Sequence, residues 1–121
     1  MAEELLLSIL IIHFVADFVL QTDKQAKGKS TSMNMLISHT LAYSLVWGVV
    51  GVLLYIFNIL VFNFPLFVLI TFTTHTITDY FTSRWGKIYW DRGNTHMGFI
   101  IVGFDQILHY IQLYLTLKFL L

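Results

Sequence analysis

The fold of this chain is decided by the segment His13-Phe-Val-Ala-Asp17-Phe-Val-Leu-Gln21, in which polar side chains recur at every fourth residue. This spacing places the imidazole, the carboxylate and the amide above one another on one face of a helix. The residues between them are apolar, so the same segment suits a lipid bilayer. A carboxylate at the centre of a bilayer-spanning helix costs about 2.5–3.5 kcal/mol, so it needs a partner from the rest of the chain.

The composition indicates an integral membrane protein. The 121 residues are 57% hydrophobic and 12% charged, and the mean hydropathy is +0.74, which is too apolar for a water-soluble domain of this size. Seven basic and seven acidic residues balance, so the chain lacks the basic field expected of a nucleic-acid-binding protein. Because there is no cysteine, disulfides, iron–sulfur clusters and thiolate catalysis are excluded, and histidine and aspartate remain as metal ligands.

Four segments approach the length of about 20 apolar residues that crosses a membrane. They are residues 4–21, 33–57, 64–84 and 96–120. We therefore predict an all-α, integral membrane four-helix bundle in a single transmembrane domain, residues 1–121. The acidic N-terminal start differs from that of a secretory signal, so the first helix is expected to be retained.

The connections carry their own signals. Asn58, Asn63 and Pro65 interrupt the apolar run between the second and third spans, which predicts a tight turn; one long bent helix is the alternative. One of residues 30–32 is expected to cap the second span, and Asn94 or Thr95 the fourth. Residues 85–94 mix tryptophan, tyrosine and basic residues, so we expect a connection along the membrane surface.

Basic residues gather in the first and third connections, which the positive-inside rule places in the cytoplasm with both termini outside. These residues are Lys24, Lys27, Lys29, Arg84, Lys87 and Arg92. With this topology, six of the seven ionisable residues within the spans fall in one layer of the cytoplasmic half. The layer contains His13, Asp17, His39, His75, Asp79 and Asp105, and His109 lies deeper. Because four helices bring these groups to one depth, we predict one shared internal site.

A weak internal repeat accompanies this layer. The spacing His13-x3-Asp17 in the first span returns as His75-x3-Asp79 in the third, and a further polar residue follows each on the next span. The repeat suggests two parallel helical hairpins related by an axis along the membrane normal.

Imidazole and carboxylate groups suit a divalent transition metal such as zinc, manganese or iron. Three aspartates repel one another in a low-dielectric layer, and the only lysine or arginine residues within the spans, Arg84 and Lys118, lie at span ends away from the layer. One divalent ion leaves a net charge of minus one and two ions leave plus one. The predicted metal ligands are His13, Asp17, His39, His75, Asp79 and Asp105. The alternative is that histidine–aspartate hydrogen bonds hold the helices together without a metal.

Several residues are assigned supporting roles. Gln21 and Gln106 would orient the ligands by hydrogen bonding, and His109 would do the same or carry protons. His96 lies at the interface and is expected to be solvated. Two glycine pairs, Gly48 with Gly51 and Gly98 with Gly103, are expected to permit close helix packing.

The order of these motifs resembles a family of small bacterial and phage membrane proteins called domain of unknown function 3307. The resemblance rests on His13, Ala16, Asp17, Phe18, Leu20, Gln21 and Thr22, then His39, His75 and Asp79, then Asp105, Gln106 and His109. It implies a protein of the bacterial inner membrane or of a phage. More loosely, histidine and aspartate on transmembrane helices resemble membrane-bound metal-dependent hydrolases.

We therefore predict a membrane hydrolase with one or two metal ions, acting on a lipid-linked or membrane-delivered substrate. Asp17, Asp79 or His109 would act as general base or acid. The alternatives are a carrier for divalent ions or protons and a non-catalytic membrane partner protein. We expect no nucleic-acid partner, and the small interior of four helices makes a homodimer an expectation.

Overall fold

A computed structural model describes residues 2–121 and shows an all-helical protein, with no strand in that range. Its elements are α1 (Ala2–Phe14), the π-helix η1 (Val15–Val19), α2 (Asp23–Gly28), α3 (Met33–Ile56), α4 (Phe64–Asp91) and α5 (Thr95–Leu120). The predicted all-α class is confirmed. Met1, which the predicted domain includes, lies outside the described residues.

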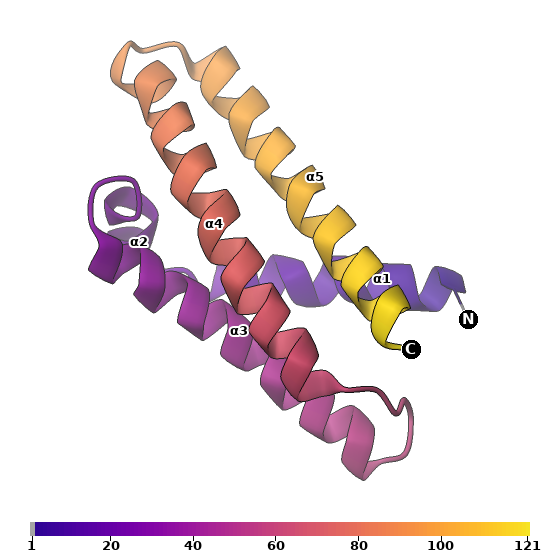
Figure 1. Cartoon of the computed structure of the whole chain (residues 1–121). Coiled ribbons are helices and arrows are strands. Elements are labelled where there is room, and N and C mark those ends of the chain that lie inside the picture. The colour runs from indigo at the N-terminus through magenta and orange to yellow at the C-terminus, as the bar shows by residue number, and fades with distance from the viewer. Residues whose placement is uncertain (1) are drawn as a thin grey trace.

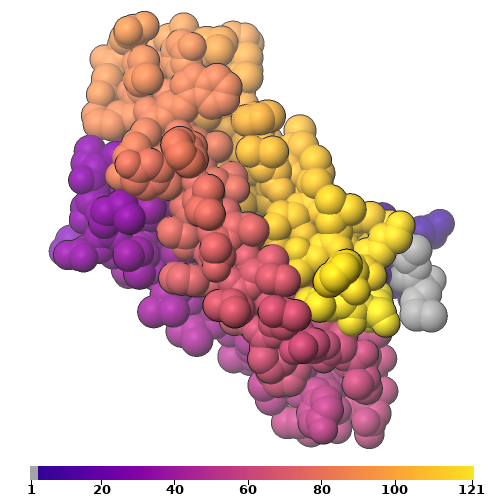
Figure 2. All heavy atoms as spheres, viewed as in Figure 1, coloured from indigo at the N-terminus to yellow at the C-terminus, as the bar shows by residue number. Residues whose placement is uncertain are grey.

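The long helices α3, α4 and α5 lie in a row with α4 in the middle, and neighbours run antiparallel (Figure 1). Helix α1 crosses behind this row. The space-filling view in Figure 2 shows α4 across the face between α3 and α5, with the α4–α5 end projecting beyond α2. Helix α1 packs on α5, whereas η1 packs on α3. Helices α1 and α3 therefore pack differently from α4 and α5. The predicted repeat of two hairpins does not extend to the packing.

The turn between α3 and α4 forms where the sequence predicts it. Helix α3 ends at Ile56, and Asn58 has a positive φ of 52°, a left-handed conformation that asparagine tolerates. The Asn63 side chain accepts a hydrogen bond from the Leu66 backbone N–H at 3.1 Å, and Pro65 lies in the first turn of α4. The alternative of one long bent helix is therefore wrong.

The first connection contains a helix that the sequence analysis missed. Helix α2 begins with a capping box, in which the Thr22 hydroxyl accepts from Gln25 N–H and the Gln25 side chain accepts from Thr22 N–H. The pattern Thr-x-x-Gln is a known helix-start signal, so α2 was detectable from the sequence. The Ser32 hydroxyl then caps α3, in agreement with the predicted cap at residues 30–32.

The expected surface connection over residues 85–94 is wrong for residues 85–91, which continue α4. The buried stripe of α4 explains the difference, because it continues at helical spacing from Asp79 through Thr82 to Gly86, which faces α5. Only residues 92–94 form the turn, with Gly93 at a φ of 70°. The Asn94 side chain caps α5 by accepting from Met97 N–H, as expected.

The outer faces of the long helices are apolar. Among the described helices, α3 and α5 are long and apolar enough to cross a membrane by length and composition. Large exposed apolar side chains lie on α1, α3, α4 and α5, for example Leu7, Ile11, Leu45, Val49, Leu69, Phe81, Ile107, Ile111 and Phe119. Contiguous exposed apolar surface is typical of proteins that contact a membrane or a partner.

The interior is divided along the helices into an apolar end and a polar end. The apolar core is formed by Ile9, Ala16, Tyr43, Trp47, Phe67, Leu113 and Leu117. Apart from Ala16, these residues lie on the side of the histidines toward the chain termini in α1 and α5, and toward the α3–α4 turn in α3 and α4. The ionisable side chains occupy the other end, near α2 and the middle of the α4–α5 hairpin.

Close packing between α3 and α4 gives a stability prediction for two glycines one turn apart. A Cβ added at Gly51 would lie 2.6 Å from Phe64 Cβ, which is fixed by the α4 backbone, whereas one at Gly48 would lie 3.8 Å from Val68. We expect Gly51→Ala to destabilise the fold by about 1–3 kcal/mol through overpacking. Gly48→Ala should be neutral or stabilise by up to about 1 kcal/mol, because alanine favours helix.

The measurement is loss of helical circular dichroism during heating in a mild detergent. Equal unfolding temperatures for the two variants would contradict the predicted contact between Gly51 and Phe64.

Candidate metal centre

The seven ionisable residues singled out in the spans meet in one buried cluster. Each is at most 7% exposed. They are His13 at the end of α1, Asp17 in η1, His39 in α3, His75 and Asp79 in α4, and Asp105 and His109 in α5. Residues from both ends of the chain thus supply one site.

The π-helix brings Asp17 into this cluster. Its wider turn is closed by a hydrogen bond from Leu20 N–H to the Val15 carbonyl at 3.0 Å, which is five residues apart instead of four. Ala16 and Asp17 are the buried residues of η1. Single π-helical turns inside α-helices are frequent at functional sites, because they change the direction of a side chain. Here Asp17 points between α3, α4 and α5.

Four ligand atoms converge from four residues. His39 Nε2 lies 3.0 Å from Asp17 Oδ1, 3.2 Å from Asp79 Oδ2 and 3.3 Å from His75 Nε2. His75 Nε2 lies 3.6 Å from the same Asp17 oxygen and 3.4 Å from the same Asp79 oxygen. A tetrahedral ion with ligands at about 2.0–2.1 Å has edges of about 3.3–3.4 Å between its ligand atoms. The four atoms therefore have the spacing of a tetrahedral metal site. We call these residues the four-ligand group.

Hydrogen bonding alone does not account for this arrangement. His39 Nε2 carries at most one proton, yet two carboxylate oxygens and a second imidazole nitrogen lie within 3.3 Å of it. Asp17 Oδ1 is buried and has no hydrogen bond of acceptable geometry among residues 2–121. A cation between the four atoms would satisfy the lone pairs of all of them.

Ring stacking orients His75. Its ring stacks on Tyr43 with centroids 3.9 Å apart and on His109 with centroids 4.1 Å apart. His75 Nδ1 has no hydrogen-bond partner in the described part of the chain, so stacking takes the place of the second hydrogen bond that usually fixes a ligating histidine.

A second set of ligand atoms, the three-ligand group, adjoins the first. It consists of Asp17, Asp105 and His109, so Asp17 belongs to both groups. His109 Nε2 lies 3.1 Å from Asp105 Oδ2 and 3.0 Å from Asp79 Oδ1. The Thr82 hydroxyl donates to the other Asp105 oxygen. Catalytic zinc sites typically have three protein ligands and one open position, and this group has that number.

His13 lies outside both ligand groups, but its Nε2 is 3.4 Å from Asp17 Oδ2 and it also connects to the groups through Gln106. The Tyr43 hydroxyl donates to His13 Nδ1 at 2.7 Å, and His13 Nε2–H donates to the Gln106 carbonyl at 2.6 Å. The Gln106 amide then donates to Asp105 at 3.1 Å and to Asp17 at 3.4 Å. Every donor in this series of hydrogen bonds has an acceptor, and Gln106 donates to both carboxylates. That it orients metal ligands stays a prediction. The prediction that His13 binds metal itself stays a prediction.

Lys29 is one of the site residues that the sequence analysis did not assign to the site. It follows α2, and its ammonium donates to Asp79 Oδ2 at 3.1 Å while its side chain is only 18% exposed. Burial opposes the charge of Lys29, but Asp79, Asp17 and Asp105 outweigh burial and raise its pKa above the usual value. One divalent ion together with Lys29 balances the three carboxylates.

The missed residues had signals in the sequence. Tyr43 lies four residues after His39 and Thr82 three after Asp79, so both share a helix face with a predicted ligand. Lys29 lies in a connection beside the predicted layer, and a lysine stem can reach inward past apolar surface.

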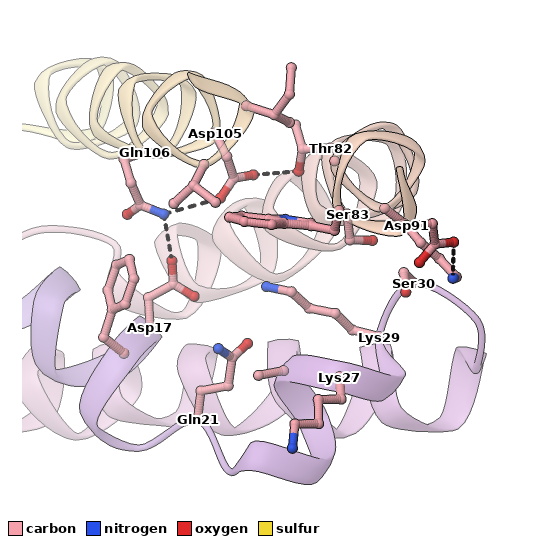
Figure 3. Close-up of a pocket in the computed structure, with 17 residues that line it drawn as sticks. Asp17, Gln21, Lys27, Lys29, Ser30, Thr82, Ser83, Asp91, Asp105 and Gln106 are labelled. Atoms are coloured by element: carbon pink, nitrogen blue, oxygen red, sulfur yellow. Dashed lines mark hydrogen bonds and ion pairs between the residues drawn. The ribbon is translucent and has the colours of Figure 1, made fainter. Parts of the chain in front are cut away.

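A pocket of about 480 Å³ opens beside the site, between η1 and α2 on one side and α4 and α5 on the other (Figure 3). Asp17 and Asp105 line it from the ligand groups, and Lys29 extends into it. Gln21, predicted to orient ligands, lines the pocket, and its carbonyl oxygen has no hydrogen-bond partner among residues 2–121. The site thus has a buried four-ligand part and a part that reaches a pocket.

The fold and the site define a class: a helical protein with two helices that could cross a membrane and buried histidine–aspartate groups that could hold a metal ion. The sequence matches the family described as protein of unknown function (DUF3307) over residues 5–121, and the chain belongs to that family. The predicted family resemblance is confirmed. No curated protein and no solved structure matches the chain.

The ligand geometry predicts metal content. Elemental analysis of detergent-purified protein should find at least one equivalent of a divalent transition metal. His75→Ala removes one of the four ligands. Losing a residue that only hydrogen-bonds a ligand typically reduces metal affinity by roughly 10- to 100-fold, so His75→Ala should reduce metal affinity by more than that. His96→Ala is the matched control, because His96 is exposed in the first turn of α5.

Equal metal content in the two variants, or a folded wild-type protein that takes up no metal at any tested concentration, would contradict the assigned ligands.

Proposed function

We propose that this chain is a membrane-embedded, metal-dependent hydrolase that acts on a lipid-linked or membrane-delivered substrate. The observation that carries the proposal is the tetrahedral spacing of the four-ligand group next to a pocket that Asp17 and Asp105 line. Two imidazoles and two carboxylates in this geometry suit zinc, with manganese and iron as alternatives.

The two ligand groups support different roles. The four-ligand group is closed by protein atoms, whereas the three-ligand group has Asp17 and Asp105 on the pocket and leaves room there for water. A bound divalent ion supplies Lewis acidity, which lowers the pKa of water to about 7 and polarises a phosphoryl or carbonyl group. When only the four-ligand group holds an ion, Asp105 and His109, which share a hydrogen bond at 3.1 Å, form a pair able to accept and pass on a proton.

The proposed membrane arrangement has four crossings, with both termini outside and α2 in the cytoplasm. The apolar outer faces of α1, α3, α4 and α5 support it, as does the grouping of basic residues around α2 and the α4–α5 turn. In this arrangement the polar end of the interior and the pocket lie in the cytoplasmic half.

A carrier for ions or protons is less compatible with the interior. A carrier needs polar groups from the site to both faces, but Trp47, Phe67, Leu113 and Leu117 pack together on the far side of the histidines. The pocket that reaches the ligand groups lies on the α2 side, whereas the pocket at the apolar end is lined by Ile9, Trp47, Phe67 and Leu117 and by none of the proposed ligands. This arrangement supports a hydrolase.

Hydrolysis is tested with zinc-loaded protein in detergent and two chromogenic probes, p-nitrophenyl phosphate and p-nitrophenyl butyrate. We expect release of p-nitrophenol from one probe that stops when the metal is chelated. Asp105→Asn should reduce the rate by about 10²–10⁴, because it removes a member of the proton-accepting pair, while the four-ligand group retains its ion. Asp23→Asn, an exposed carboxylate at the start of α2, is the control and should keep the rate.

Two results would overturn the proposal. Metal-loaded protein that hydrolyses neither probe, yet transports divalent ions across proteoliposomes, would indicate a carrier. Inactive protein that stays folded when His75 and Asp79 are both replaced by leucine would indicate a structural cluster.

A further inference from the structure

The pocket beside the metal centre has polar groups that the metal site does not use. The Gln21 carbonyl oxygen and the Ser83 hydroxyl are buried, line this pocket and lack hydrogen-bond partners among residues 2–121. Buried polar atoms are nearly always paired, and one left unpaired costs about 1–3 kcal/mol. Their presence on one pocket indicates a ligand that can accept one hydrogen bond and donate another.

The cation in the pocket is Lys29. Figure 3 shows its side chain reaching from the end of α2 into the space between Asp17 and Asp105. Within the described residues its ammonium makes one hydrogen bond, to Asp79, so two of its three donors remain for a ligand. Lys27 adds a second positive charge to the lining, whereas Lys87 is paired with Asp91. With one divalent ion bound, Lys29 balances the remaining carboxylate charge, so the net charge left on the lining is the positive charge of Lys27.

Part of the lining is apolar and reaches the outer surface. Phe18 lines the pocket from η1 and is 42% exposed, and Ile101 and Val102 line it from α5. A ligand in this pocket can thus place a charged group at Lys29 and an apolar group past Phe18, toward the surface that we assign to the lipid.

From these contacts we propose that the pocket binds the phosphate group of a membrane amphiphile, with Lys29 as the residue that holds the phosphate. This inference rests on the proposed hydrolase function and specifies its substrate class. A phosphate accepts several charge-assisted hydrogen bonds from an ammonium group and from the Ser83 hydroxyl. A hydroxyl group of the amphiphile would donate to the Gln21 carbonyl, and its chain would leave along Phe18.

Binding is measured by isothermal titration calorimetry on zinc-loaded protein in detergent with three probes. Dihexanoylphosphatidic acid carries both phosphate and apolar chains, dihexanoylglycerol lacks the phosphate, and inorganic phosphate lacks the chains. We expect the phosphatidic acid to bind at least about tenfold more tightly than either of the other probes. The inference would be overturned if dihexanoylglycerol bound as tightly as the phosphatidic acid, or if inorganic phosphate bound more tightly than it. It would also be overturned if none of the three probes bound.

Variants then locate the phosphate. Lys29→Gln should weaken phosphatidic acid binding by about tenfold or more, and Lys29→Arg should restore most of it, because arginine keeps the charge and donors. Lys24→Gln is the matched control, since Lys24 is an exposed lysine of α2, the helix that Lys29 follows, and does not line the pocket. Gln21→Leu tests the pocket without touching Asp79 and should also weaken binding.

Metal content is measured on the same samples, which separates the two proposals. Protein that takes up no metal counts against the hydrolase. If the metal-loaded Lys29→Gln and Gln21→Leu variants both bind the phosphatidic acid as tightly as Lys24→Gln does, that result counts only against the phosphate site.

Discussion

Three buried carboxylates, Asp17, Asp79 and Asp105, impose the constraint on which the rest of this structure depends. Each is at most 7% exposed, and unpaired anions in such an interior would be strongly disfavoured. Each of α1, α3, α4 and α5 contributes a histidine that lies beside one of these carboxylates, and Lys29 after α2 adds a positive charge. With Lys29 present, one divalent ion suffices to neutralise the three carboxylates, which removes the excess negative charge that the spans alone would have.

Much of the fold and the general place of the site followed from local rules. The four apolar segments, the turn at Asn63 and Pro65, and the cap at Asn94 depend on neighbours a few residues apart. The common depth of the histidines and aspartates depends only on helix rise and on where each helix ends. These features are fixed by distances along the chain, so they can be predicted without knowing how the helices cross.

The roles of individual residues depend on helix rotation and crossing, which spacing does not contain. His13 and His109 each lie four residues from an aspartate, yet His109 enters the three-ligand group while His13 faces Tyr43 and Gln106. The π-helix turns Asp17, and α1 crosses the row of long helices instead of lying along it. The contact between Lys29 and Asp79 spans 50 residues and needs the whole fold.

The division of the interior along the helix axes bears on what the site can do. Toward the apolar end, Tyr43 separates His13 and His75 from Trp47 and Phe67, so the metal centre is sealed on that side by rings in contact. Toward the other end, the π-turn and α2 hold the pocket open beside Asp17. An ion bound beside this core would meet a charged group that enters from the pocket. Toward the apolar end, the Gln112 amide donates hydrogen bonds to the Thr71 and Thr116 hydroxyls, and these polar side chains lie among apolar residues. This difference between the two ends is why we propose chemistry on a bound molecule instead of passage of an ion.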